Sequence, residues 1–94
     1  MNIWNQWKLD FWFYFDRKEE AEEAKNELEK HGFALTNLGK TSDDRAWLCI
    51  VTKSADPQQV RRLLEDIAKR FKGKYHGWET PWLNPDTLEA VIFE

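Results

Sequence analysis

Residues 9–15 have the sequence LDFWFYF, in which large apolar side chains recur at every second position. In an extended strand, residues two apart point to the same face. The spacing therefore predicts a strand whose one face is fully apolar and consists of Leu9, Phe11, Phe13 and Phe15. The other face carries Asp10, Trp12 and Tyr14. Because both faces are mostly aromatic, we expect a central strand with helices over one face.

A helix is predicted directly after this strand, from Arg17 to His31. Asp16 is its expected N-cap, and Glu19 follows three residues later as in a capping box. The apolar stripe of this helix is narrow and made of Ala21, Ala24 and Leu28. Gly32 is expected to end it as the C′ residue.

The second helix has the clearest helical pattern in the chain. Asp56 is its expected N-cap, Pro57 occupies N1, where proline is favoured, and Gln59 occupies N3. Gly73 is expected to end it. Apolar side chains recur at helical spacing and predict its buried face: Val60, Leu63, Leu64, Ile67, Ala68 and Phe71.

Further strands are predicted at 33–38, 46–52 and 74–78, with an added edge strand at 90–93. A short helical turn at Asn84-Pro85-Asp86 is also possible from its turn-forming residues. The resulting order, β-α-β-β-α-β, is the split βαβ pattern of the ferredoxin-like fold. We therefore expect an α+β sandwich with a four-stranded antiparallel sheet and both helices on one face.

The length of 94 residues indicates a single domain spanning residues 1–94. One cysteine excludes an internal disulfide and a multi-cysteine metal site, which favours a reducing compartment such as the cytoplasm. No apolar run approaches the length needed to span a bilayer, and the early Asp10 argues against a secretion signal. We expect a cytoplasmic protein without a membrane partner.

Charge is unevenly distributed along the chain, although the formal net charge is only −3. Residues 16–30 are mainly acidic, whereas residues 61–74 are mainly basic. An acidic balance argues against direct nucleic-acid binding. An RNA-binding sheet with exposed Trp12, Tyr14 and Trp47 is the competing interpretation, but the basic-glycine-aromatic signature is absent. Six tryptophans point either to a core beneath the chain termini or to a protein interface.

No catalytic, cofactor or metal site is predicted. His31 lies at a helix end, where a capping role is favoured, and His76 has no second histidine or cysteine motif to form a metal site. Cys49 lies inside a predicted strand and is expected to be a small buried apolar group. The paired glutamates of the first helix are expected to form a solvated face. We therefore expect a protein that is not an enzyme.

The segment Tyr75-His76-Gly77-Trp78-Glu79-Thr80 carries the most specific pattern. Gly77 permits a positive φ or a close backbone approach, and Trp78 is expected to anchor the chain. The segment resembles the Tyr-Asp-Gly-Trp-x-Thr element of the regulator of ribonuclease activity B family, with His76 where that family usually has Asp. The likeness extends over residues 9–81. It implies a ferredoxin-like α/β sandwich that acts by binding and restraining ribonuclease E, the endoribonuclease that initiates messenger-RNA decay in bacteria.

Two functions remain open from the sequence: a non-catalytic regulator of such a ribonuclease, or an immunity protein that neutralises a bacterial toxin, possibly a nuclease. Both imply a protein partner, a basic nuclease or nuclease scaffold. Charge reversal at Glu22, Glu23 and Glu79 is expected to leave stability nearly unchanged, as for exposed charges; the alternative is that Trp78 is core and the glutamates only solvate the surface. The candidate partner-binding residues are Glu19, Glu22, Glu23, Tyr75, His76, Trp78, Glu79 and Trp82.

Overall fold

Strand β1 (Leu9–Phe15) is the middle strand of a five-stranded antiparallel sheet in the computed structural model, which describes residues 8–83 and 90–93, with side chains for residues 8–79. The strand order is β2-β3-β1-β4-β5. The other elements are α1 (Lys18–Lys30), β2 (Ala34–Lys40), β3 (Trp47–Lys53), α2 (Pro57–Arg70), β4 (Lys74–Leu83) and β5 (Ala90–Phe93).

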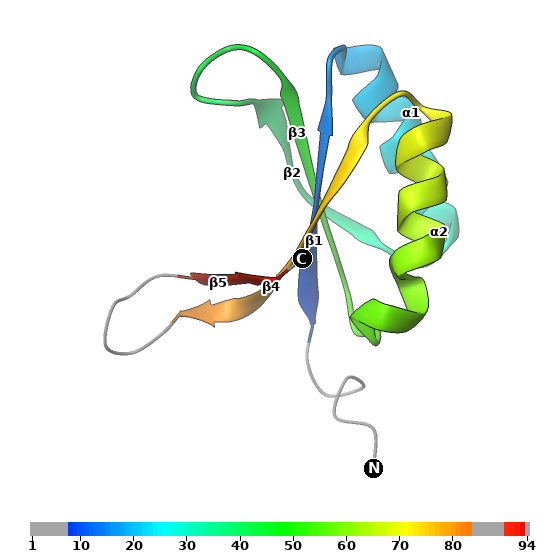
Figure 1. The fold of residues 1–94 in the computed structure, drawn as a ribbon, viewed down its shortest axis with the longest axis vertical. Coiled ribbons are helices and arrows are strands. Elements are labelled where there is room, and N and C mark those ends of the chain that lie inside the picture. Colours follow the sequence, from blue (N-terminus) through cyan, green and yellow to red (C-terminus); the bar gives the residue numbers. More distant parts are fainter. Residues whose placement is uncertain (1–7, 84–89, 94) are drawn as a thin grey trace.

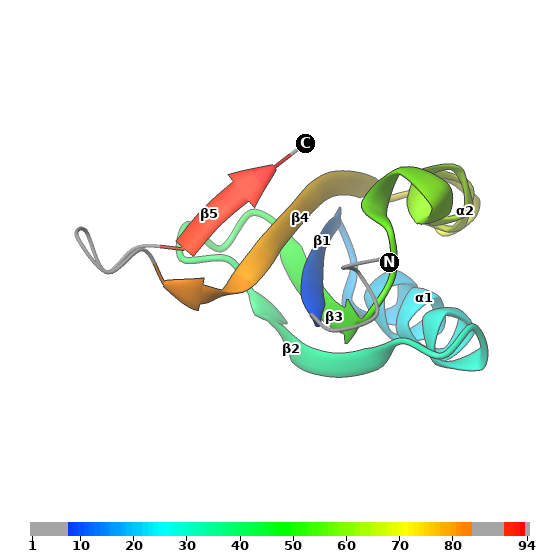
Figure 2. The ribbon, with the colours of Figure 1, turned by 90° about the horizontal axis from the view of Figure 1, so that it is seen from below.

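Both helices lie on the same side of the sheet, and no helix of residues 8–83 and 90–93 lies on the other side (Figures 1 and 2). The predicted β-α-β-β-α-β order and the α+β class are confirmed. The added edge strand is also confirmed as β5, whose Phe93 pairs with Trp78 of β4. The predicted helical turn at 84–86 lies outside the described residues.

The core forms on the helix side of β1, where Leu9, Phe11, Phe13 and Phe15 are at most 1 % exposed. The alternating burial of this strand confirms the period-two prediction. Its antiparallel partner β3 adds Cys49 and Val51, which lie opposite Phe13 and Phe11 and are fully buried. Helix α1 covers this layer with its three predicted small or apolar residues, Ala21, Ala24 and Leu28.

Helix α1 begins one residue later than predicted. Arg17, not Asp16, is its N-cap, and the Arg17 backbone N–H donates to the carboxylate of Glu20 at 3.2 Å. The capping-box prediction therefore has the right spacing but the wrong register. The acidic run that follows supplies a glutamate at N3 in either register, so the sequence did not distinguish them.

Helix α2 begins as predicted, since a side-chain oxygen of Asp56 accepts from the backbone N–H of Gln58 at 2.9 Å and Pro57 follows. Leu64 and Ile67 are fully buried. The predicted face is broader than the observed one, because three of its residues are only half-buried at the border of the core: Val60, Leu63 and Phe71.

The two helices end in the same hydrogen-bonded turn, but only one uses glycine for it. Gly32 has φ of 89° after α1, whereas Lys72 takes φ of 63° after α2. The backbone N–H of Gly73 then donates to the Ala68 carbonyl at 2.7 Å, completing a Schellman motif. Gly73 is required for a different reason: a Cβ there would overlap the ring of Phe15 and lie 2.7 Å from the Tyr14 carbonyl oxygen.

Two variants test which residues of the predicted α2 face lie in the core. Leu64→Ala is expected to reduce the free energy of unfolding by about 2–5 kcal/mol, since a fully buried leucine leaves a cavity. Phe71→Ala should cost less, because solvent already reaches its ring. Urea denaturation of both variants measures the difference; an equal or larger loss for Phe71→Ala would contradict this placement.

A second pair of variants tests the roles of Lys72 and Gly73 at the end of α2. Gly73→Ala is expected to destabilise the protein by more than about 2 kcal/mol, because the added methyl group meets backbone that cannot rotate away. Lys72→Gly is expected to leave stability unchanged or to raise it by up to about 1 kcal/mol, since glycine adopts a positive φ without strain. Thermal denaturation checks both; a marked loss for Lys72→Gly would show that its side chain matters.

Candidate functional site

The motif segment forms the centre of β4 and contains a β-bulge. Trp12 of β1 pairs with Gly77, but the next residue, Phe13, pairs with Tyr75, so His76 is the extra residue. Gly77 has φ of 143°, a conformation that other residues rarely adopt, which confirms its predicted role. The bulge brings Tyr75 and Trp78 to the helix side although they are three residues apart; both pack against the core.

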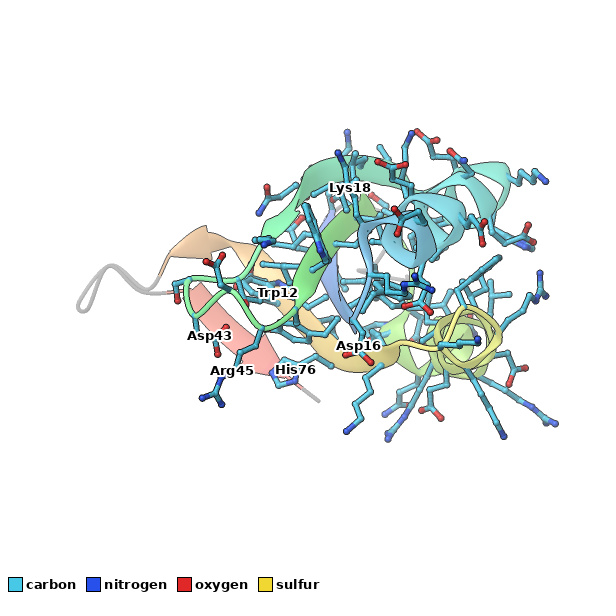
Figure 3. The ribbon with its side chains drawn as sticks, turned by 90° about the horizontal axis from the view of Figure 1, so that it is seen from above. Trp12, Asp16, Lys18, Asp43, Arg45 and His76 are labelled. Carbon is cyan, nitrogen blue, oxygen red and sulfur yellow. The ribbon has the colours of Figure 1, made fainter. Side chains whose placement is uncertain are left out.

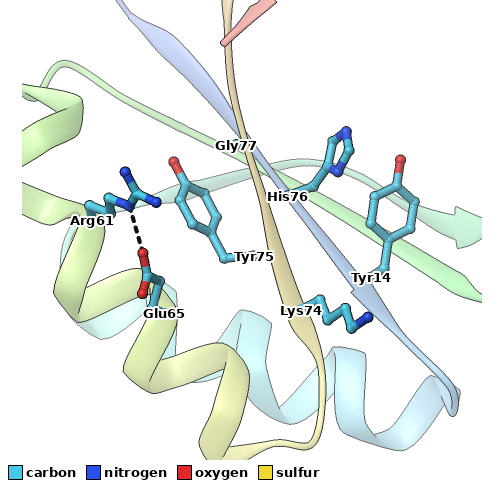
Figure 4. A pocket seen from close by; sticks show the side chains of 7 residues that line it. All are labelled: Tyr14, Arg61, Glu65, Lys74, Tyr75, His76 and Gly77. Atoms are coloured by element: carbon cyan, nitrogen blue, oxygen red, sulfur yellow. Dashed lines mark hydrogen bonds and ion pairs between the residues drawn. The ribbon is translucent and has the colours of Figure 1, made fainter. Parts of the chain in front are cut away.

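Residues of the motif also line a pocket of about 270 Å³ beside β4 (Figure 4). Arg61 and Glu65 of α2 form an ion pair at 2.6 Å on one side of the strand, next to Tyr75. The Tyr75 ring lies 5.2 Å from that of Phe13, and burial raises its pKa to about 12. Tyr75 therefore stays protonated at neutral pH and holds β4 against the core.

The opposite side of the sheet forms an open face, which we define by Asp10, Trp12 and Tyr14 of β1 and His76 and Glu79 of β4. Figure 3 shows Trp12 and His76 on the side away from both helices. The rings of Tyr14 and His76 meet edge to face at 5.4 Å. The indole N–H of Trp12 is buried without a hydrogen-bond partner of normal geometry among the described residues.

Two carboxylates lie side by side on the open face, because Asp10 pairs directly with Glu79. Only 9 % of Glu79 is exposed. Burial raises the pKa of Glu79, the indole N–H of Trp12 lowers it, and the neighbouring charge of Asp10 raises it; the net pKa lies above its usual value. The pKa of Asp10 is also raised, by burial, against a hydrogen bond from Thr52 that lowers it.

Helix α1 carries the other predicted glutamates on the side of the sheet opposite the open face (Figure 1). Glu22 pairs with Lys18 at 3.8 Å, and the Glu27 carboxylate lies 3.4–3.7 Å from the side-chain nitrogens of Lys30, His31 and Arg70. Glu19 and Glu23 are exposed and have no ion pair within residues 8–79. They line a shallow pocket together with the basic side chains of Arg17, Arg70 and Lys72.

The eight predicted partner-binding residues do not form one surface. Glu19, Glu22 and Glu23 lie on α1, Tyr75 and Trp78 pack beneath β4, and His76 and Glu79 lie on the open face. Glu79 is buried, so the expectation that its charge reversal leaves stability unchanged is wrong. Trp82 belongs to β4, but its side chain lies outside the described part of the chain.

Asp10 belongs to the open face, but it is not among the residues predicted from the sequence to bind a partner. Its place on the same face as Trp12 follows from the period of two, but its pairing with Glu79 depends on the register between β1 and β4, which the bulge shifts. The bulge could have been predicted from the spacing of Tyr75 and Trp78 in the sequence. Two core aromatics three residues apart in a strand require an extra residue between them.

The arrangement of the metal-ligating side chains and the state of the cysteine bear on the chemistry of the described residues. No group of three or more His, Cys, Asp or Glu side chains there could hold a metal ion. Burial raises the pKa of Cys49 to about 11, so the fully buried thiol stays protonated. No helix in the described ranges is long and apolar enough to cross a membrane.

Comparison with known proteins explains the motif. The model of the family described as Regulator of ribonuclease activity B matches residues 3–80 of the 94-residue chain. The chain belongs to this family. No curated protein and no solved structure matches the chain. As a member of the regulator of ribonuclease activity B family, the protein belongs with regulators of ribonuclease activity, and the bulged β4 motif lies inside the matched region.

The buried carboxylate pair makes stability depend on pH in a defined direction. A pKa that is raised in the folded state means that folding favours the protonated form, so this contribution is complete below the usual pKa, 4.5 for Glu79, and is lost as the pH rises through the raised pKa. Glu79→Gln should therefore raise Tm at neutral pH, by about 2–6 °C. The gain should shrink as the pH approaches 4.5.

Thermal denaturation of the wild type and Glu79→Gln between about pH 4 and pH 7 measures this effect. Asp66→Asn, which removes an exposed carboxylate of α2, is the matched control and should change Tm little. A rise in Tm for Glu79→Gln that does not depend on pH would contradict the raised pKa of Glu79.

Proposed function

We propose that this protein regulates ribonuclease E by binding to it in the cytoplasm, without catalysing a reaction itself. The observation that carries the proposal is the family match over residues 3–80, which includes both helices and the β4 motif. The family consists of regulators of ribonuclease activity. A protonated buried Cys49 and the paired or solvated carboxylates of α1 are consistent with a binding role.

Two surfaces are suited to different stages of binding. Glu19 and Glu23 of α1 are exposed carboxylates without an ion pair within residues 8–79, and such charges accelerate the encounter with a basic partner through long-range attraction. The open face supplies the aromatic and buried groups that typically hold a complex together. Tyr75 and Trp78 support that face from beneath, and Trp82 lies further along the same strand.

Surface plasmon resonance with immobilised ribonuclease E, together with an RNA-cleavage assay, tests the proposal. We expect the wild type to bind and to slow cleavage. Purified RNA immobilised on a second channel should bind weakly or not at all, because a net charge of −3 gives no counterion-release advantage. Absence of binding to ribonuclease E would reject the proposal, and binding to a toxin nuclease instead would favour an immunity protein.

The contribution of α1 is tested by charge reversal with a matched control. Glu23→Lys and Asp66→Lys both reverse an exposed helical carboxylate that has no ion pair among the described residues, but on different helices. Glu23→Lys should slow association about 3–10-fold at low salt and little at high salt, with Tm nearly unchanged. Association rates that respond equally to both variants would show that α1 has no special role.

A further inference from the structure

Among the residues that the structure describes, Asp10 and Glu79 on the open face have no basic side chain beside them of the kind that Glu27 has on α1. Glu27 faces Lys30, His31 and Arg70 within 4 Å. For Asp10 and Glu79, by contrast, no lysine, arginine or histidine within residues 8–79 forms an ion pair with either. A carboxylate that is only 9 % exposed and faces a second one costs stability. A buried carboxylate without a cationic partner, on a face that no described helix covers, is typical of a binding site.

The surroundings of the pair define the chemistry that would compensate it. Residues directly opposite on antiparallel strands have Cβ atoms roughly 4.5–5.5 Å apart, so one planar guanidinium can reach both carboxylates. Trp12 is the next residue on the same face of β1, and its N–H acts on the Glu79 carboxylate. Its cross-strand neighbour Gly77 has no side chain to cover the indole. A part-buried indole beside two carboxylates suits an arginine, which also stacks on aromatic rings.

No helix of the described residues covers this face. Both helices lie on the other side of the sheet, and the far ends of β4 and β5 project away from those helices (Figures 1 and 2). Tyr14 and His76 lie further along the same face, at the end of the strands opposite Glu79. An arginine at the Asp10–Glu79 pair would therefore have Trp12 as its aromatic neighbour.

We infer that Asp10, Glu79 and Trp12 form a subsite for an arginine side chain presented by the ribonuclease partner. This inference rests on the proposed function and deepens it. The arginine donates hydrogen bonds to both carboxylates, relieves their mutual repulsion and stacks against the indole. The two carboxylates therefore lower the stability of the free protein and raise the affinity of the complex. If their role were purely structural, removing them would lower the stability of the free protein.

Dissociation from immobilised ribonuclease E distinguishes this subsite from the surface of α1. Glu79→Gln and Asp10→Asn should each accelerate dissociation about tenfold or more, because buried charge pairs act on the dissociation rate. Their association rates should stay within about twofold of the wild type, and their Tm values should be equal or higher. Asp66→Asn, which also removes one carboxylate, should dissociate like the wild type.

Blocking the arginines of ribonuclease E with phenylglyoxal tests the partner's side of the contact. The treatment should weaken binding of the wild type more than binding of Glu79→Gln, because that variant has already lost the interaction. Equal weakening of both would overturn the assignment of arginine.

The outcomes separate the two proposals. If the wild type binds ribonuclease E but both variants dissociate as slowly as it does, the subsite is wrong and the proposed function stands. Faster dissociation accompanied by a lower Tm would likewise overturn the subsite, since it indicates structural damage. If the wild type does not bind ribonuclease E, the proposed function itself fails.

Discussion

The packing of β1 between two neighbouring strands and beneath two helices is the constraint on which the rest of the molecule depends. Four large side chains of this strand, Leu9, Phe11, Phe13 and Phe15, are buried on one face. Because the period of a strand is two, that burial forces Asp10, Trp12 and Tyr14 to the opposite face. The open face with its aromatic and acidic groups is thus a direct consequence of how the core is built.

Strand β4 packs against the same core, but its two core-facing aromatic residues are three positions apart instead of two. Tyr75 and Trp78 both pack against the core, and the bulge at His76 makes this possible. Gly77 is needed there because its φ of 143° is not available to other residues without strain. The family motif is therefore first a solution to strand packing. By placing His76 and Glu79 beside β1, the same bulge also determines which groups the open face presents.

The sequence predicted most of the fold but less of the site, and the reason is physical. The start of α2, the central strand and the edge strand follow from local patterns such as Asp56-Pro57 and the alternation in 9–15, which the structure confirms. The burial of Glu79 could not be predicted locally, because it depends on a register shift between strands distant in sequence. The predicted partner-binding residues come mainly from the first helix and the segment 75–80, and the sheet places these on opposite sides.

This separation assigns different physical tasks to the two groups of carboxylates. Exposed charges such as Glu23 contribute little to stability and act over about a Debye length, so they affect how fast a basic partner arrives. Buried charges such as Glu79 cost stability and act only at contact, so they affect how long the partner stays. Glu27 has Lys30 and Arg70 within 4 Å, whereas no lysine or arginine within residues 8–79 forms an ion pair with Asp10 or Glu79. This difference is the reason for our proposal that the counter-charge of the Asp10–Glu79 pair comes from another molecule.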